Sequence, residues 1–156
     1  MAGTKSSARK PSKKKSPAGK GLTRRAYVIF VSHSTKDRWI ARRIAELLEA
    51  GGRKYGVAAF LDERDIQVGD SIPDTIRDNI KECSEFLVLL SKNSIDRPWV
   101  LIEISAAWGH GKRIIAVIDK VTPEEMPEIM LPYKAIDLNS LDEYIGQMLV
   151  RAKGAR

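Results

Sequence analysis

The sequence predicts an α/β fold in which a parallel five-stranded sheet is covered by helices on both faces. Short apolar runs, each long enough for one strand, alternate along the chain with longer segments of helical periodicity. The apolar runs are continuous rather than alternating with polar residues, which is typical of strands buried on both faces. With 156 residues, 43% of them hydrophobic, the chain is long enough for one domain and too short for two of ordinary size.

Five apolar segments are the expected strands. They are residues 26–31 (AYVIFV), 57–61 (VAAFL), 86–90 (FLVLL), 114–118 (IIAVI) and a weaker fifth at 134–138. Because helical segments separate them, the expected winding is flavodoxin-like, with the strand order 2-1-3-4-5. No internal repeat is visible in the sequence.

Helices are expected between and after these strands. The first begins at a cap provided by Ser34 or Thr35 and runs to about residue 50, where two glycines end it. Its core face is formed by Ile40, Ile44, Leu47 and Leu48. Further helices are expected at 71–82, at 98–108, as a short helix at 123–130, and at 140–152.

The positive charge of the chain is concentrated at its amino-terminal end. The net charge is +7, but residues 1–25 hold nine lysines and arginines and no acidic residue, so the remainder is near −2. Residues 1–25 have too few apolar side chains to offset the entropy lost on ordering. We therefore expect a disordered basic tail over 1–25, followed by one domain over 26–152.

Two interpretations of this tail stay open. It is either an electrostatic arm that binds nucleic acid or an anionic membrane, or a solvated leader without a binding role. No aromatic residue interrupts its lysines, so we expect no specific nucleic-acid partner. No apolar run approaches the roughly 18–20 residues of a membrane-spanning helix, and no secretory signal follows the basic start. The single cysteine fits a reducing compartment, and we expect a cytoplasmic protein.

Polar segments follow the first three predicted strands, at 32–37 (SHSTKD), 62–65 (DERD) and 91–94 (SKNS). In sheets of this winding, ligands bind at the carboxyl ends of the strands where the strand order reverses. That point lies between the first and third strands. Although loops of this kind are polar in most proteins, the topology makes 32–37 and 91–94 the walls of the crevice to be tested.

The helix expected at 98–108 contains one charged residue, Glu103, in an otherwise apolar run. A helical wheel places the core face on Val100, Leu101, Ile104 and Trp108, and a different face on Trp99, Glu103, Ala106 and Ala107. Ile102 points away from both faces, which suggests an exposed contact residue. A partly desolvated carboxylate bordering a cleft is a functional candidate, whereas a solvent-facing glutamate is the ordinary alternative, and both stay open at this point.

Other chemistries have little support in the sequence. The chain has no G-x-G-x-x-G motif, no phosphate-binding P-loop, and only two histidines and one cysteine, far apart, which gives no metal-binding cluster. Cys83 is expected to be a small core residue, and His110 a structural residue at a helix end. His33 is either a site residue or an ordinary loop histidine.

Four blocks of the sequence together resemble a known family. They are VIFVSHSTKDRWIARRIAELL, FLDERDIQVGDSIPDTIRDNI, FLVLLSKNSIDRPWVLIEISAAW and RIIAVI, in that order within residues 26–150. The ordered set resembles a Toll/interleukin-1 receptor (TIR) domain of the bacterial type. The resemblance implies a flavodoxin-like sheet of five parallel strands, which agrees with the fold expected from the apolar pattern.

The resemblance also implies roles for individual residues. In TIR enzymes that consume NAD, a glutamate on the third helix is catalytic and follows a tryptophan, which corresponds here to Glu103 after Trp99. The loop after the first strand contributes substrate contacts, which correspond to Ser32, His33 and Ser34. The 62–70 loop resembles the family's BB loop, which mediates assembly and can close a neighbour's site, and its Asp62 is a further expected substrate contact.

The resemblance therefore implies an NAD glycohydrolase or cyclase that cleaves the nicotinamide–ribose bond, with NAD as substrate and no cofactor. Self-association through the 62–70 loop and the third helix, a further TIR or effector protein as partner, and an immune role such as antiphage defence are expected with it. The alternative is a non-catalytic TIR interaction module that mimics host adaptors. Glu103 favours the enzyme, because an adaptor has no need of a carboxylate there. An electron-transfer flavodoxin has little support, because no phosphate-binding first loop is evident.

Overall fold

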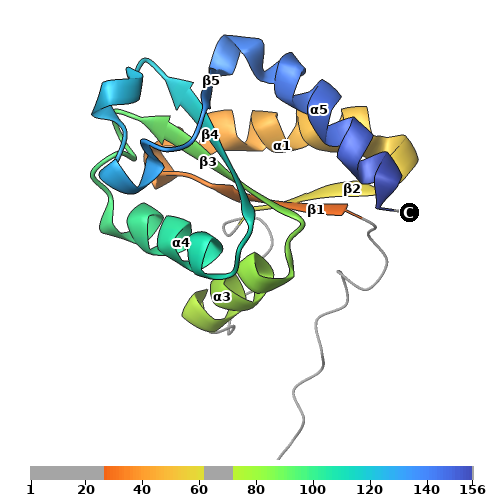
Figure 1. Cartoon of the computed structure of the whole chain (residues 1–156), viewed down its shortest axis with the longest axis horizontal. Helices are drawn as coiled ribbons and strands as arrows, with labels where there is room; N and C mark the ends of the chain where they lie inside the picture. Colours follow the sequence, from red (N-terminus) through yellow and green to blue (C-terminus); the bar gives the residue numbers. More distant parts are fainter. Residues whose placement is uncertain (1–26, 62–71, 156) are drawn as a thin grey trace, which may run out of the picture.

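The computed structural model describes residues 27–61 and 72–155, and its middle layer is a five-stranded parallel sheet (Figure 1). The strand order is β2-β1-β3-β4-β5, as the sequence predicts. The strands are β1 (Tyr27–Ser32), β2 (Val57–Phe60), β3 (Glu85–Ser91), β4 (Arg113–Asp119) and β5 (Ala135–Asp137). The predicted basic tail and the 62–70 loop lie outside the described residues.

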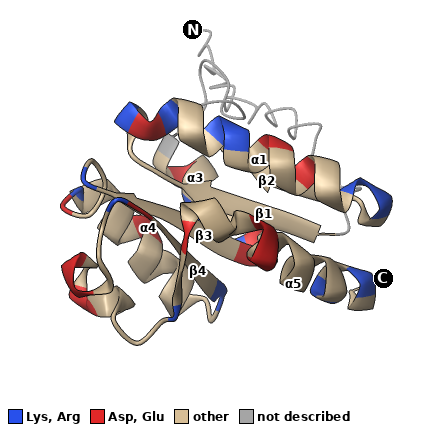
Figure 2. Cartoon of the chain, turned by 90° about the horizontal axis from the view of Figure 1, so that it is seen from above, with Lys and Arg blue, Asp and Glu red and all other residues tan. Residues whose placement is uncertain are grey.

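Two helices cover each face of the sheet (Figure 1). One face carries α1 (Arg38–Gly52) and α5 (Leu141–Gly154), and the other carries α3 (Ile72–Glu82) and α4 (Pro98–Gly109). Figure 2 shows that the charge of α5 reverses along the helix, from acidic residues in its first turn to basic residues in its last, which complements the helix dipole. Within the described ranges, no helix is both long and apolar enough to cross a bilayer.

The pleat of β1 divides the core into two layers. Ile29 and Val31 face α1 and α5, whereas Phe30 faces α3 and α4. Phe30 stacks between Phe60 and Phe86 of the neighbouring strands, with ring centroids 5.2 and 5.4 Å apart. The same alternation puts the last residue of β1, Ser32, on the face that α4 covers.

The first helix differs from the prediction at its start and on its inner face. Residues 35–37 form a separate 3-10 turn capped by Ser34, and α1 begins only at Arg38. The buried stripe of α1 consists of Ala41, Ile44, Ala45 and Leu48, whereas Leu47 is 42% exposed and was wrongly placed on the core face. Two alanines let the helix lie close to the sheet, so the buried stripe is narrower than the hydrophobic pattern suggests.

The end of α1 requires glycine for packing. A Cβ atom on Gly52 would lie 2.3 Å from the Val57 side chain, so the chain can turn into β2 here only without a side chain. Gly56, in a left-handed conformation, completes the turn.

The predicted short helix at 123–130 is also wrong in detail. The segment forms two 3-10 turns, Pro123–Glu125 and Glu128–Met130, on either side of Pro127. Proline lacks the backbone N–H that a continuous helix would need at that point.

Candidate active site at the carboxyl edge of the sheet

Glu103 of α4 and Ser32 at the end of β1 meet at the carboxyl edge of the sheet. The Ser32 Oγ donates a hydrogen bond to Glu103 Oε2 at 2.5 Å. Both residues are almost fully buried, with 1% and 3% of their surface exposed. A buried carboxylate is costly unless it is hydrogen-bonded, and a bond to an ionised group is short and strong. The fold therefore joins Glu103, the predicted catalytic residue, to Ser32, one of the predicted substrate contacts.

The orientation of α4 corrects the helical wheel. The buried residues are Val100, Glu103, Ile104 and Ala107, which form a continuous stripe along one side of the helix. Trp108, predicted to lie in the core, is 63% exposed, whereas Ile102 is exposed as expected. Because α4 is apolar on nearly every side, its hydrophobic pattern does not show which side faces the sheet. The carboxylate that interrupts the pattern belongs to the inner face.

Trp99 lies about one helical turn before the buried carboxylate. It precedes Glu103 by four residues, so the two side chains are neighbours along one side of the helix. The indole is 40% exposed, in contrast to the buried Glu103. A partly exposed aromatic ring about one helical turn from a carboxylate can stack against a planar heterocycle.

The first two residues of the loop after β1 are buried although they are polar. His33 is 8% exposed, and its Nδ1 lies 3.2 Å from the Val31 carbonyl oxygen. The Ser34 hydroxyl accepts a hydrogen bond from the Lys36 amide, and thereby caps the following turn. The expected substrate contacts of His33 and Ser34 stay predictions, and Asp62 lies outside the described residues.

A second carboxylate, that of Asp37, joins the loop after β1 to the loop after β3. Ser91 Oγ donates to Asp37 Oδ2 at 2.5 Å, and Asn93 Nδ2 donates to Oδ1 at 2.6 Å. Asp37 is 5% exposed. Sequence reasoning placed all three residues in the walls of the crevice but missed that this carboxylate connects them. An acidic residue at the start of a helix was the available signal.

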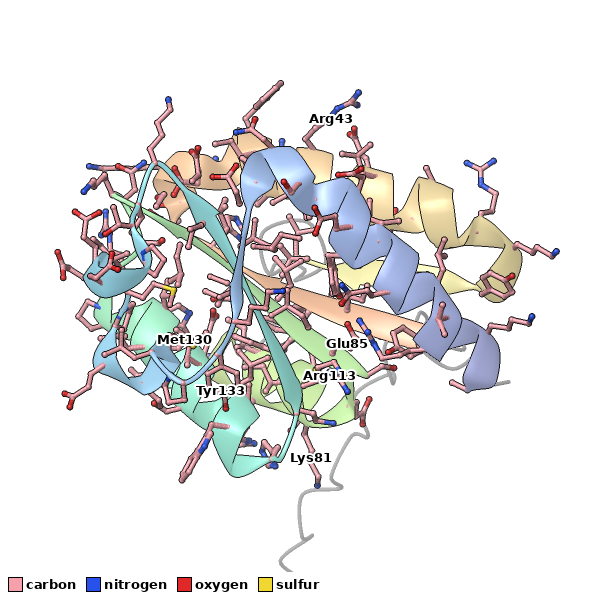
Figure 3. The ribbon with its side chains drawn as sticks, turned by 45° about the horizontal axis from the view of Figure 1, so that its top comes forward. Arg43, Lys81, Glu85, Arg113, Met130 and Tyr133 are labelled. Atoms are coloured by element: carbon pink, nitrogen blue, oxygen red, sulfur yellow. The ribbon has the colours of Figure 1, made fainter. Side chains whose placement is uncertain are left out.

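A third buried carboxylate, Glu85, lies at the opposite end of the sheet, beside α5 (Figure 3). Tyr27 and Tyr144 donate to it from their hydroxyl groups at 2.5 and 2.6 Å, and the Arg151 guanidinium forms an ion pair with it. Burial acts to raise the pKa of Glu85, but the hydrogen bonds from Arg151, Tyr144 and Tyr27 outweigh it and the pKa is lowered. Sequence reasoning missed this cluster, although a lone acidic residue opening an apolar strand was visible.

The phenol groups of this cluster respond to the same carboxylate. Burial, and then the hydrogen bond to Glu85, raise the pKa of Tyr27 to about 12. The pKa of Tyr144 is also raised, first by burial and then by the charge of Glu85. Both tyrosines therefore stay protonated as hydrogen-bond donors at neutral pH, and the cluster is built to hold an ionised glutamate.

Cys83 is a core residue, as predicted. Its thiol is buried and donates to the Ile80 carbonyl at 3.1 Å, and burial raises its pKa to about 11. A thiol so protonated is a poor nucleophile at neutral pH. Within residues 27–61 and 72–155, no group of three histidine, cysteine or acidic side chains is arranged to hold a metal ion.

A cavity of about 650 Å³ lies between α1 and the start of α5. Its apolar side includes Trp39, Ile40 and Leu47, and Asp119 and Lys120 line its end near β4. Because it lies on the α1 and α5 face of the sheet, it is separate from Glu103, which α4 carries on the other face.

The chain is similar in sequence to a family model and to several known proteins. A family model described as a TIR domain matches residues 29–149. The chain is 27% identical over 111 residues to the probable 2′ cyclic ADP-D-ribose synthase BdTIR of Brachypodium distachyon, covering 71% of this chain and 47% of that protein. It is 25% identical over 107 residues to the NAD(+) hydrolase TcpC of Escherichia coli O6:H1, covering 64% and 33%. The chain thus spans less than half the length of either relative.

Solved structures support the same fold. The TIR domain of the Toll-related receptor TRR-2 from Hydra magnipapillata superposes with a TM-score of 0.61 at 16% identity, covering 79% of this chain and 94% of that domain. At this identity the likeness concerns the arrangement of strands and helices and not the chemistry.

Proposed function

The chain belongs to the TIR-domain family, and from that premise we propose that it is an enzyme that cleaves the nicotinamide–ribose bond of NAD. The observation that carries the proposal is the Glu103 carboxylate, buried at the carboxyl edge of the sheet, hydrogen-bonded by Ser32 and bordered by the half-exposed Trp99. The names of the two relatives given above, a cyclic ADP-ribose synthase and an NAD hydrolase, support it.

The chemistry requires one well-placed negative charge. When the bond between ribose C1′ and the nicotinamide nitrogen breaks, its electron pair goes to the ring nitrogen, which becomes neutral. Positive charge then develops on the ribosyl group, as in glycoside cleavage. A carboxylate held beside that group stabilises the developing charge. Since nicotinamide leaves without being protonated, the reaction needs no general acid beside the Glu103 carboxylate.

Ser32 and Trp99 have supporting roles in this proposal. An ionised carboxylate offers about four lone-pair positions, so Glu103 can accept a hydrogen bond from Ser32 and from a ribose hydroxyl at the same time. Ser32 would thus orient the carboxylate while the substrate is bound. Trp99 would stack on the nicotinamide ring or shape the wall beside it. His33, Ser34 and Asp62 are proposed as further substrate contacts, with NAD as substrate and no separate cofactor.

The acceptor of the ribosyl group decides the product. Attack by water gives ADP-ribose, whereas attack by a hydroxyl group of the same molecule gives a cyclic isomer. Both outcomes follow from one bond cleavage at Glu103, and separation of the products by chromatography identifies which acceptor this chain uses.

The proposal is tested by incubating the purified chain with NAD, with and without a crowding agent, and separating the products. We expect release of nicotinamide by the parental chain and its loss in Glu103→Gln, which keeps the shape of the side chain and removes its charge. The matched control is Glu46→Gln, a change in an exposed glutamate of α1. Absence of turnover under all conditions would instead indicate a non-catalytic interaction module.

We further propose that the enzyme is active in an assembly of several copies. Three large apolar side chains of α4, those of Trp99, Ile102 and Trp108, are exposed, and apolar side chains exposed in such number on one helix suggest a contact surface. The predicted contribution of the 62–70 loop lies outside the described residues. Such an assembly would serve immune signalling, including antiphage defence, and the single cysteine is consistent with action in the cytoplasm.

Assembly is tested by measuring specific activity over a hundredfold dilution series. Activity per molecule should rise with protein concentration. In Ile102→Lys the same rise should need a higher protein concentration. The thermal stability of this variant should not fall, because Ile102 is exposed. A flat profile for the parental chain would indicate a self-sufficient monomer.

A further inference from the structure

We infer that Asp37 is a positioning residue, whose buried carboxylate ties the loop after β1 to the loop after β3 and so holds Ser32 in place against Glu103. The catalytic part of this inference rests on the proposed function. The coupling of the two loops rests on geometry alone and can be measured separately.

Asp37 binds the second loop with both of its oxygen atoms. Oδ2 accepts from the Ser91 hydroxyl and Oδ1 from the Asn93 side-chain amide. Asp37 also directly precedes α1, where the helix dipole favours a negative charge. A carboxylate suits this position because it only accepts hydrogen bonds and both of its neighbours donate them. An asparagine would turn an N–H group towards one donor.

On one side, this link continues directly to Ser32. The Asp37 amide donates to the Ser34 carbonyl at 2.8 Å and closes a turn between them. Only His33 separates that turn from Ser32, and His33 is itself buried. A displacement of Asp37 would therefore be transmitted to the end of β1, where the Ser32 hydroxyl lies.

On the other side, the link continues to α4 through a loop that is held by its own hydrogen bonds. The Ser94 hydroxyl accepts from the Ser91 amide at 2.8 Å and donates to the Leu89 carbonyl at 2.7 Å. The Arg97 amide then donates to the Ser94 carbonyl at 3.1 Å, one residue before α4 begins. Asp37 is thus connected to the start of the helix that carries Glu103.

The two cross-links act on opposite faces of the sheet. The Ser32–Glu103 hydrogen bond lies on the face covered by α4, because Ser32 follows Phe30 in the pleat. The side chain of Ser91 points to the other face, like Leu87 and Leu89, and meets Asp37 there. The end of β1 is therefore tied to α4 on one face and, through Asp37, to the end of β3 on the other, so loss of Asp37 would let the ends of β1 and β3 shift relative to each other.

The kinetic test compares Asp37→Asn, Ser32→Ala and the double variant in NAD turnover. Asp37→Asn should lower kcat roughly ten- to hundredfold, as expected for small misplacement of a reacting group, with KM nearly unchanged. The double variant should lose little more than Ser32→Ala alone, since both act on the same carboxylate. Ser91→Ala, which removes a donor from the other loop, should show the same pattern of lowered kcat and retained KM.

The matched control is Asp142→Asn, which removes an exposed acidic residue from the first turn of α5 and should leave kcat unchanged. A parental kcat in Asp37→Asn, or losses that multiply in the double variant, would overturn the positioning role. Thermal midpoints measured on every variant separate a loss of folded protein from a loss of turnover.

Hydrogen exchange tests the coupling without any activity. In Asp37→Asn, amides of both 32–37 and 91–97 should exchange faster, whereas those around Glu85, at the other end of the sheet, should not change. Faster exchange in the first segment alone would overturn the coupling. If the parental chain released no nicotinamide, the proposed function would fail, and the exchange pattern would still decide whether Asp37 joins the two loops.

Discussion

Each end of the sheet buries a glutamate, and the two differ in the groups that surround them. Glu85, at the amino end, is held by a guanidinium and two phenol groups from the first strand and the last helix. Glu103, at the carboxyl edge, accepts from the hydroxyl of Ser32 and lies beside a half-exposed indole. Both side chains are 3% exposed or less, so burial does not distinguish them.

Because the two carboxylates are equally buried, the place of each one in the sheet indicates its use. The Arg151 guanidinium and two tyrosine hydroxyl groups donate to Glu85 and lower its pKa. The negative charge of Glu85 therefore serves to hold α5 on the sheet. Glu103 accepts a hydrogen bond from the Ser32 hydroxyl, and it lies at the edge where ligands bind in sheets of this winding.

The largest effect is expected at the carboxyl edge. Glu103→Gln should lower NAD turnover by about 100-fold or more, which is the scale of losing one electrostatic contact in a transition state. Its thermal midpoint should stay close to the parental value, since Gln can still accept from Ser32. Nicotinamide release and a thermal melt of the same preparation measure both quantities. Turnover at the parental rate would contradict the electrostatic role.

The reciprocal change at the amino end should affect stability instead. Glu85→Gln removes one partner of a largely buried ion pair, and should lower the free energy of unfolding by about 2–4 kcal/mol. The expected loss is smaller than for a fully buried ion pair, because the Arg151 side chain keeps some contact with solvent. Urea denaturation measures the loss. Activity per folded molecule should be unchanged, and a specific loss of turnover would show that the two ends are not independent.

Acid should act on the amino end in a defined direction. Because folding lowers the pKa of Glu85, the stabilisation is fully present above its unfolded value of about 4.3 and is lost as the pH falls through the folded value. Urea midpoints measured from pH 7 to pH 3 should therefore fall in the parental chain, and less steeply in Glu85→Gln. Parallel curves for the two proteins would show that another group controls acid unfolding.

The smallest effect is expected at the rim of the proposed site. Trp99→Ala should raise KM for NAD roughly fivefold, corresponding to about 1 kcal/mol of stacking on a partly exposed ring. Trp99→Phe should recover most of this loss, because it keeps an aromatic face. Steady-state kinetics measure the change. A fall in kcat with unchanged KM would indicate that Trp99 shapes the wall around Glu103 rather than binding the ring.

The strands were predictable from the sequence because each consists of consecutive apolar residues that only a sheet covered on both faces can bury. The order of the strands followed from their alternation with helices, and the structure agrees. The faces of the helices were less predictable. In α4 the apolar residues surround the axis, so Trp108 and Ala107 exchange the places that periodicity assigned to them. In α1 the alanines, and not Leu47, make the close contact.

Only the part of the candidate site that depends on strand order could be predicted from the sequence. Topology brings the loops after β1 and β3 together, and the resemblance to TIR domains selects Glu103 and Ser32. The hydrogen bonds of Asp37 and Glu85 join residues 54 to 66 positions apart in the sequence, and no local pattern encodes such pairings. They depend on the pleat of each strand and on the rotation of each helix, which the folded structure alone determines.

The cluster around Glu85 has a consequence for how the domain can be joined to other chains. It fastens Tyr27, where the described fold begins, to Tyr144 and Arg151 of the helix that ends it. Both ends of the described fold therefore lie at one pole, and the carboxyl ends of the strands, where Ser32 meets Glu103, lie towards the other (Figure 1). A tag, linker or neighbouring domain attached at either end would leave the edge that holds Glu103 unobstructed, and the domain would face outward from a larger scaffold with that edge foremost.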